Sequence, residues 1–308
     1  MKKRIVCGFA GMMLLLGSVS VPVASAMDLE PRQWGHMPLG TNVIGAGYAY
    51  TSADIYFDPV MKVEDVKMKM NTAALKYVHS FGLLGKSARV DIAQGYMDGK
   101  WTGLLNGSPA SVTRSGWSDT IVRVATNLYG APPLAGKEFA AYRQKTASET
   151  IVGTGLAVRL PTGEYMPDKL INLGQNQYVV RPQLGVMHTH KKWTTELTGE
   201  VAISSVNDEF YNNSTLKQDP LYIIHAHLAH TFRPGLWLGG SVGYDYGGRS
   251  SVDGVTKISR VQDIGWALSL MIPLNRHAVI KTSYLGTRTQ ESTGFDSDTV
   301  STGVAVAW

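Results

Sequence analysis

The end of the chain restricts the fold more than any other segment. Val300, Thr302, Val304, Val306 and Trp308 alternate with the small residues Ser301, Gly303, Ala305 and Ala307. A period of two is that of a β-strand with two unlike faces, and outer-membrane barrels place aromatic rings where their strands leave the bilayer. We therefore predict that residues 298–308 form the closing strand of a transmembrane barrel. Trp308 would lie in the interfacial girdle and serve as a contact for the barrel assembly machinery.

The beginning of the chain predicts export. Lys2, Lys3 and Arg4 precede a mostly apolar stretch, and Ala24-Ser25-Ala26 then supplies a small-residue cleavage pattern. We predict that residues 1–26 are a cleaved signal peptide and that Cys7, the one cysteine of the chain, leaves with it. An exported protein without disulfides needs another source of stability, and a closed hydrogen-bonded barrel is one.

Charge and hydropathy narrow the possible partners. Without the three leader cations, 26 basic residues face 24 acidic ones, and no basic block stands out. This balance argues against nucleic acid as a partner. After the leader, no run reaches the roughly 18–20 apolar residues of a membrane helix. The expected surroundings are therefore outer-membrane lipid, contacted by strands.

Two-residue periodicity between turn signals predicts twelve strands. They cover residues 41–52, 66–80, 87–98, 116–129, 150–161, 177–190, 193–206, 219–232, 236–247, 259–272, 277–288 and 298–308. Short connections alternate with longer polar ones at 53–65, 99–115, 162–176, 207–218, 248–258 and 289–297. Barrels place short turns in the periplasm and long loops outside. The predicted fold class is all-β, a transmembrane antiparallel up-and-down β-barrel of about twelve strands over residues 41–308, in the outer membrane of a Gram-negative bacterium.

Two further segments depart from this pattern. Residues 27–40 precede the first strand, contain Trp34-Gly35-His36-Met37-Pro38-Leu39, and are expected to enter the lumen as a small plug. Residues 137–145 lie within a connection where a short turn is expected, and their composition predicts a short helix at the membrane surface.

Parity along the strands separates two faces. Apolar rows such as Ile44-Ala46-Tyr48-Tyr50 and Ile264-Trp266-Leu268-Leu270 are assigned to lipid. Charged side chains fall on the opposite parity in strand after strand, because Arg or Lys facing the bilayer midplane costs about 2–4 kcal/mol. The predicted pore-lining residues are Lys76, Arg89, Asp91, Asp119, Arg123, Arg159, Arg181, Glu196, Glu200, His225, Asp245, Asp263 and Lys281.

Two predictions concern the lumen itself. Assumed registers bring Arg159, Arg181, Glu200 and His225 into one charged belt near mid-membrane, with Glu200 opposite His225. The loop at 161–176 is unusually apolar for a free loop. We expect it to fold over or into the mouth and set the constriction, or else to pack only on neighbouring loops.

Catalytic and metal sites find little support. His188 and His190, like His225 and His227, place two imidazoles on one strand face, which is the beginning of a metal site. We interpret them as interfacial and lumen residues, so no metal and no cofactor is expected. A barrel lipid hydrolase would need a Ser–His pair facing lipid near the outer leaflet. The outward histidines fall near periplasmic strand ends instead, so no enzyme is expected.

Several motifs resemble one family. They are Trp34-Gly35-His36-Met37-Pro38-Leu39-Gly40-Thr41-Asn42, Asp91-Ile92-Ala93-Gln94-Gly95, Ser115-Gly116-Trp117-Ser118-Asp119, Leu160-Pro161-Thr162-Gly163-Glu164-Tyr165 and Arg181-Pro182-Gln183-Leu184-Gly185. Over nearly the whole mature chain the sequence is similar to the outer-membrane family named for the meta-pathway of phenol degradation. The resemblance implies a barrel transporter, and the family name suggests aromatic substrates.

Two functions remain open at this point. One is a channel for small apolar or aromatic molecules, and the other is a structural or interaction barrel with a blocked lumen. Met68, Met70, Val43, Ile121 and Met97 lie on the inward parity among the charges. A partly apolar wall suits ring compounds, which favours the channel.

Overall fold

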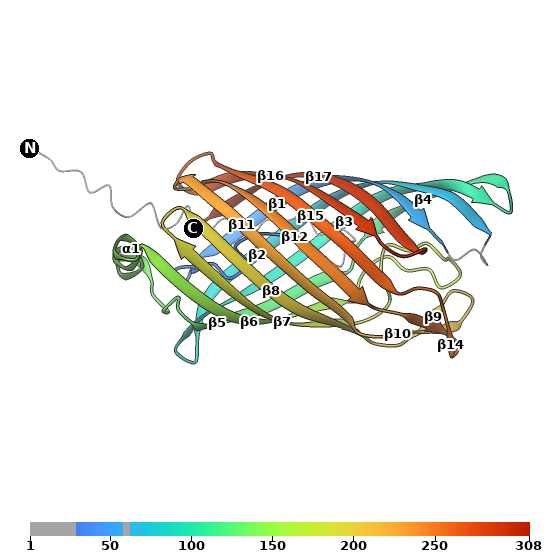
Figure 1. Ribbon diagram of the computed structural model, residues 1–308, viewed down its shortest axis with the longest axis horizontal. Coiled ribbons are helices and arrows are strands. Elements are labelled where there is room, and N and C mark those ends of the chain that lie inside the picture. The colour runs from blue at the N-terminus through green and yellow to red at the C-terminus, as the bar shows by residue number, and fades with distance from the viewer. Residues whose placement is uncertain (1–28, 58–61) are drawn as a thin grey trace, which may run out of the picture.

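The protein is a closed antiparallel β-barrel of twelve strands (Figure 1). It is seen in a computed structural model that describes residues 29–57 and 62–308. The predicted signal peptide, residues 1–26, lies outside the described residues. Among the described residues, no helical segment has the length and hydrophobicity of a membrane-crossing helix. The fold class and the strand count predicted from periodicity are both confirmed.

The wall follows the chain order, and additional short strands project from one end. The wall strands are β1 (Asn42–Tyr56), β2 (Val63–Leu83), β3 (Lys86–Leu105), β4 (Ser108–Trp117) with β5 (Thr120–Tyr129), β6 (Ser148–Leu160), β7 (Val179–His190), β8 (Trp193–Ser204), β11 (Leu221–Arg233), β12 (Leu236–Gly247), β15 (Val261–Pro273), β16 (Ala278–Thr289) and β17 (Gly294–Ala307). The additional strands are β9 (Asn207–Phe210), β10 (Ser214–Gln218), β13 (Ser250–Val252) and β14 (Val255–Thr256). One helix, α1 (Gly136–Lys145), is found in the described part of the chain, where a helix over residues 137–145 was predicted.

The seam that closes the barrel joins the first and last strands. β1 and β17 pair from Val43 opposite Ala307 to Tyr56 opposite Gly294. Beyond this ladder, the backbone groups of Asn42 and Trp308 exchange two hydrogen bonds of 3.0 Å. The predicted pairing of the first with the last strand is therefore confirmed.

The two ends of the barrel differ. At the turn end, neighbouring strands are joined by short turns such as Leu84-Gly85, and this end also carries α1 and Trp308 (Figure 1). At the loop end, the connections are longer and several of the strands project. Barrels of this class place short turns in the periplasm.

Three connections predicted as loops contain strands. β3 continues to Leu105 and β4 starts at Ser108, so most of the expected loop at 99–115 is a projecting hairpin. Its turn residues Asn106 and Gly107 have φ of 51° and 75°, which are the values of a type I′ turn matched to strand twist. The expected loops at 207–218 and 248–258 contain β9, β10, β13 and β14, which form a separate four-stranded sheet.

The predicted strand at 116–129 is interrupted. β4 and β5 both pair with β3, and the chain leaves the ladder between them at Ser118 and Asp119. Each oxygen of the Asp119 carboxylate accepts a backbone N–H from the long connection, that of Gly163 at 3.0 Å and that of Gln175 at 2.9 Å. The break in the strand thus anchors the connection between β6 and β7.

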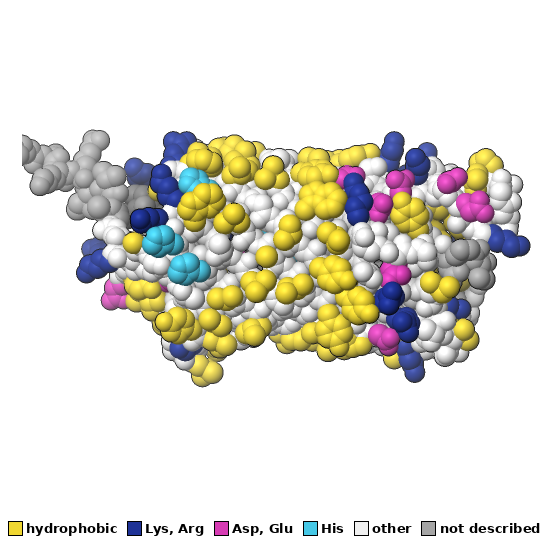
Figure 2. Space-filling view, viewed as in Figure 1, with side chains coloured by type: hydrophobic (Ala, Val, Ile, Leu, Met, Phe, Trp, Pro, Cys, Tyr) yellow, Lys and Arg dark blue, Asp and Glu magenta, His cyan; other side chains and the backbone are white. Residues whose placement is uncertain are grey.

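A belt of exposed apolar side chains surrounds the middle of the barrel. Leu228, Val242, Leu268 and Val300 are each about half exposed, and Figure 2 shows hydrophobic side chains across the wall with charges mainly toward the ends. Such a surface is stable against hydrocarbon and unfavourable in water.

Candidate functional site

Of the thirteen residues predicted to line the pore, twelve lie on wall strands, on the face opposite the exposed apolar rows, and Asp119 lies between β4 and β5. Ten of them are buried, whereas Lys76, Arg159 and Arg181 are partly buried. Buried charges need partners, because an isolated charge loses the stabilisation that water provides. Their contacts therefore show how the interior is organised.

A polar network begins on β3 and crosses to β7. Asp91 lies 3.3 Å from Arg89 on its own strand and 3.1 Å from Arg123 on β5. Arg123 also donates from Nε to the Gln183 side chain on β7 at 2.6 Å. This contact passes over β6 at Gly155, where a Cβ would lie 3.0 Å from Gln183 Oε1.

Glu200 on β8 is the centre of the network. Its Oε2 accepts from Gln183 Nε2 at 3.0 Å and lies 2.8 Å from Arg181 Nη2. Its Oε1 lies 2.9 Å from His225 Nε2 on β11. One carboxylate thus joins β7 to β11.

Two histidines extend the network to β12. His225 Nδ1 lies 2.7 Å from His227 Nε2, and His227 Nδ1 lies 2.7 Å from Ser241 Oγ. If His225 donates to Glu200, then His227 donates to His225 and Ser241 donates to His227. All three contacts are satisfied with both rings neutral. Ser241 and both histidines are buried, so this Ser–His contact is enclosed within the wall.

The predicted charged belt is formed in part, with one register corrected. Gln183 pairs with Glu200 and Met187 with Glu196. Glu200, however, pairs with Ile223, and His225 pairs with Thr198, two residues from the assumed register. The connection between β8 and β11 contains its own hairpin, so its midpoint does not set the register. His225 still reaches Glu200 diagonally, because a two-residue shift keeps every side chain on its face.

Arg159, Asp245 and Asp263 are among the predicted residues that stand apart from this network. Among the described residues, no hydrogen bond or ion pair joins Arg159 to Glu200, so Arg159 is not bound to the centre of the network. Asp245 on β12 and Asp263 on β15 face each other directly in the ladder. One carboxylate oxygen of each is buried without a hydrogen-bond partner in the described structure.

Residues 29–41, hereafter the N-terminal segment, lie against this inner wall. Glu196 on β8 accepts the backbone N–H of Arg32 at 2.7 Å and that of Gln33 at 3.1 Å. The Trp34 indole donates to Thr198 Oγ1 at 2.9 Å, and Trp34 is only 1 % exposed.

Two wall glycines make room for the Trp34 ring. A Cβ on Gly153 would lie 2.1 Å from the ring, and a Cβ on Gly185 would lie 1.9 Å from its nitrogen. The Arg123 guanidinium lies over the Trp34 ring, 4.9 Å from its centroid. The charged network and the N-terminal segment therefore share one residue.

A second anchor holds the segment to the opposite wall. Glu30 forms an ion pair with Lys281 on β16, and Lys76 on β2 lies 4.0 Å from the same carboxylate. Two of the predicted lumen cations are thus neutralised by a residue that the sequence alone did not single out.

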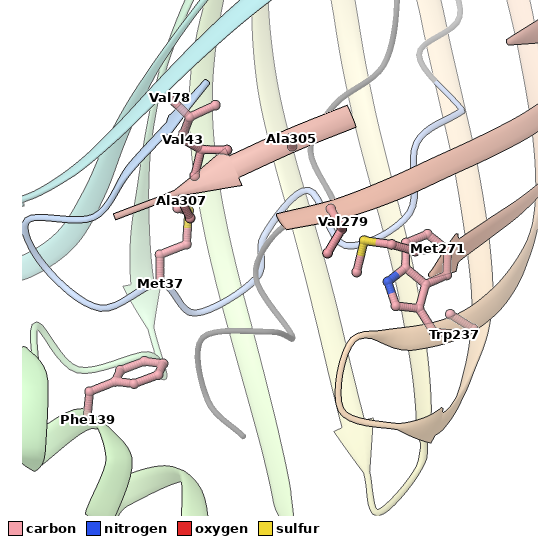
Figure 3. Packing of buried hydrophobic residues seen from close by; sticks show 10 residues of the cluster. Met37, Val43, Val78, Phe139, Trp237, Met271, Val279, Ala305 and Ala307 are labelled. Carbon is pink, nitrogen blue, oxygen red and sulfur yellow. The ribbon is translucent and has the colours of Figure 1, made fainter. Parts of the chain in front are cut away.

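At the turn end, an apolar cluster packs beneath α1. Met37 from the N-terminal segment belongs to one buried cluster with Val43, Val78, Ala307 and Phe139 of α1 (Figure 3). His36 packs edge-on against Phe139 with ring centroids 4.7 Å apart. The helix therefore covers the N-terminal segment as well as lying at the end of the barrel.

Glu149 connects this helix to the wall. Its carboxylate accepts from Tyr142 Oη at 2.8 Å and from Arg143 Nη1 at 2.6 Å, and His36 lies 3.4 Å away. Partial burial, followed by the hydrogen bond to Glu149, raises the pKa of Tyr142. Tyr142 therefore remains a neutral donor at physiological pH.

At the loop end, the interior becomes apolar. Val66, Met70, Met97 and Trp101 are buried in one cluster on the inner side of β2 and β3. The neighbouring residues that point outward include Lys67, Lys69 and Lys100, which are exposed. Charges on the outer face and apolar groups inside indicate that this part of the barrel lies beyond the membrane.

Residues 161–178, hereafter the mouth loop, reach this cluster. Ile171 and Leu173 pack against it, and Arg114 on β4 donates to the Ile171 carbonyl at 3.2 Å. On the other side, Tyr165 Oη donates to the carbonyl of Glu209 on β9 at 2.9 Å. The mouth loop therefore contacts both the inner wall and a neighbouring projection.

Several residues of this site were missed by reasoning from the strands. Gln183 has the parity of Arg181 but is uncharged, and Glu30, Arg32 and Trp34 precede the first strand. The motifs that contain Trp34 and Gln183 resemble those of a family. This resemblance marks the two positions but does not say what the residues contact. Among the described residues, no group of three His, Cys, Asp or Glu side chains is placed to hold a metal ion.

Comparison with solved structures places the fold among bacterial outer-membrane barrels. An outer membrane channel from Pseudomonas putida F1 is similar with a TM-score of 0.74 and 18 % identity, covering 91 % of this chain and 100 % of that chain. The β domain of the Bordetella autotransporter BrkA has a TM-score of 0.47 and 8 % identity, covering 87 % and 100 %. The translocator domain of autotransporter NalP from Neisseria meningitidis has a TM-score of 0.46 and 11 % identity, covering 89 % and 90 %.

Sequence comparison gives the family. No curated protein matches the chain. A family model matches residues 47–302, which is most of the chain and nearly all of the barrel. The protein therefore belongs to the family described as "Putative MetA-pathway of phenol degradation".

Proposed function

We propose that the protein is an outer-membrane channel through which small apolar or aromatic molecules enter the periplasm. Its relative in Pseudomonas putida F1 is named an outer membrane channel, and the family name points to phenol degradation. Barrels of this class place short turns in the periplasm, so the loop end faces the outside of the cell and the turn end faces the periplasm.

The observation that carries the proposal is the apolar cluster at the loop end. Buried Val66, Met70 and Trp101 line the inner wall, and Ile171 and Leu173 of the mouth loop pack against them. Small-molecule sites are mostly apolar, with a few placed polar groups. A ring compound leaving water would meet this surface first, and the polar network on β3–β12 next.

The N-terminal segment is then a movable closure on the periplasmic side. It is held by side-chain contacts to the wall, including Glu196 and Thr198, and it forms no strand of the barrel. A channel needs this segment to move, whereas an interaction barrel with a blocked lumen does not. Trp34 is buried, which is expected of a blocked lumen. The test below therefore distinguishes the two functions.

The test is the uptake of labelled toluene by whole cells with an intact lipopolysaccharide layer, with and without the protein. We expect faster initial uptake with the protein, and slower uptake when Ile171→Asp places a charge in the apolar cluster. The control is Val255→Asp, because Val255 is 60 % exposed on β14 and lies outside the cluster. Uptake that does not depend on the protein would refute the channel and favour the blocked barrel.

A lipid hydrolase is the weaker alternative. The outward histidines lie at the turn end, where His188 contacts Thr150 at 2.8 Å and His79 contacts Asn42 at 2.9 Å. The serine–histidine contact seen in the described residues, Ser241 with His227, is buried inside the wall. Neither arrangement presents a nucleophile to lipid in the outer leaflet.

A further inference from the structure

A cavity of about 210 Å³ lies beside the N-terminal segment at the turn end. Arg32 and His36 of the segment line one side, and the inner-wall residues Met187 and Thr194 line another. The turns between β7 and β8 and between β11 and β12 complete it with Lys191, Lys192, Arg233 and Pro234. The cavity thus lies where the lumen would open toward the periplasm.

The charge of this cavity is strongly unbalanced. Arg32, Arg143, Lys191, Lys192 and Arg233 all line it, together with one acidic side chain, Glu149. Figure 2 shows Lys and Arg side chains gathered at this end of the molecule.

The acidic side chain is already engaged. Glu149 is bound by Tyr142 and Arg143, so its charge is largely neutralised within the wall. Among the described residues, no acidic side chain pairs with Lys191, Lys192 or Arg233. An anion entering the cavity would therefore meet several cations whose charge is uncompensated.

Buried donors accompany these cations. Arg32 is 8 % exposed, and its Nη2 donates to Thr231 Oγ1 at 2.5 Å while its Nε has no hydrogen-bond partner in the described structure. The hydroxyls of Thr189 and Thr194 lie 3.2 Å apart on the inner wall. Guanidinium and hydroxyl groups in one cavity are suited to a carboxylate, which accepts hydrogen bonds from both.

The remaining lining is apolar and the space is small. Met187, Phe232 and Pro234 contribute nonpolar surface, and the volume is below the roughly 300 Å³ at which sites for drug-sized ligands begin. A single aromatic ring with one acidic group fits both the size and the chemistry.

We propose that this cavity binds the carboxylate of a small aromatic acid and forms the periplasmic exit site of the channel. The proposal rests on the proposed function for the direction of movement, but not for the binding itself. The carboxylate lies among Lys192, Arg233 and Arg32, and the ring lies against Met187 and Pro234. Uncharged aromatic molecules make only the apolar contacts of this site.

The test measures binding of benzoate to the purified barrel in nonionic detergent by isothermal titration calorimetry. Benzyl alcohol provides the same ring without the charge, and inorganic phosphate provides an anion without the ring. We expect benzoate to bind at least about tenfold more tightly than benzyl alcohol, and removal of two cations by Lys192→Gln with Arg233→Gln to weaken it about tenfold.

A matched control keeps the net charge of that variant. Lys86→Gln with Lys137→Gln removes two exposed lysines at the same end, neither of which lines the cavity. Benzoate should bind this control as it binds the wild type. Equal weakening in both variants would mean that overall charge, not this cavity, attracts the anion, and would overturn the proposal.

The other outcomes are equally decisive. Phosphate binding as tight as that of benzoate would assign the site to phosphate-bearing headgroups and refute an aromatic acid. A barrel that accelerates toluene uptake but binds no benzoate would refute this inference alone. One that binds benzoate but leaves toluene uptake unchanged would refute the proposed channel and leave the site standing.

Discussion

Replacing Glu196 with alanine should release the N-terminal segment from the lumen wall. The carboxylate accepts two backbone N–H groups of that segment, from Arg32 and from Gln33, and it is 4 % exposed. Hydrogen bonds to a charged group contribute about 1.5–3 kcal/mol each, so the variant loses roughly 3–6 kcal/mol of anchoring. Since 1.4 kcal/mol is a factor of ten, the ratio of open to closed molecules should rise about 100- to 10,000-fold.

The glutamine variant refines this prediction. In Glu196→Gln the amide oxygen still accepts one N–H, while the NH₂ group faces the other donor. About half of the anchoring should remain, with a rise in the open ratio of about 10- to 100-fold. Asp245→Asn is the matched control, because it makes the same chemical change in a buried lumen carboxylate that has no hydrogen bond to the segment.

Two assays measure the opening. Conductance in planar bilayers should rise in the order wild type, Glu196→Gln, Glu196→Ala, with Asp245→Asn near the wild type. The thiol introduced by Met37→Cys, at a position that is 5 % exposed, should react with a water-soluble thiol reagent faster in the same order. Unchanged conductance together with a protected cysteine in Glu196→Ala would refute the anchoring role.

Three further changes test other parts of the structure. Gly185→Ala should displace Trp34, because the new Cβ would lie 1.9 Å from the indole nitrogen, whereas Gly199→Ala on the outer side of β8 has nothing within 4 Å; equal conductance of the two would contradict the predicted fit. Deleting Trp308, which is 59 % exposed, should lower the amount of barrel in the outer membrane without blocking export, and Trp308→Phe should restore it; normal surface levels after deletion would argue against the role. Glu200→Ala leaves Arg181 and His225 without their shared acceptor and should lower the free energy of unfolding by about 3–5 kcal/mol, measured by urea unfolding in detergent. Glu138→Ala, on the exposed side of α1, should lower it little. A similar loss in both variants would show that Glu200 is not the centre of the network.

The fold could be predicted from the sequence because lipid imposes one rule on every strand. Within the membrane, an apolar side chain faces outward and a polar one faces inward, as with Leu75 and Lys76 on β2. This contrast repeats often enough to give the strand count, the seam and the assignment of faces. Gly and Pro residues in the turns mark where the strands end.

The same rule explains what was missed. Beyond the membrane the contrast on β2 reverses, since Lys67 and Lys69 are exposed to water and Val66 and Met70 are buried. Reading for a constant pattern therefore ended β3 too early and turned the hairpin at Asn106-Gly107 into a loop. The register of β8 with β11 was missed for another reason, because the hairpin between them sets an offset that composition does not reveal.

The N-terminal segment also lacked a pattern of its own. Its contacts are made by single side chains such as Glu30 and Trp34, and its partners lie on strands far along the chain. Neither a period of two nor a period of 3.6 marks such a segment. Its place in the lumen depends on wall glycines such as Gly153. The need for glycine there is evident only once the facing Trp34 ring is known.

The position of this segment directly before β1 has a consequence for how firmly each contact must hold. Trp34 is joined to the seam strand by only the residues from Gly35 to Thr41, so its rebinding is intramolecular. Short tethers give effective concentrations in the millimolar range. A contact with an intrinsic dissociation constant of roughly 0.1 mM would then keep the lumen occupied most of the time, yet would release it quickly. The tether lets a closure be both nearly always in place and fast to open, which a separate plug protein could match only at millimolar abundance.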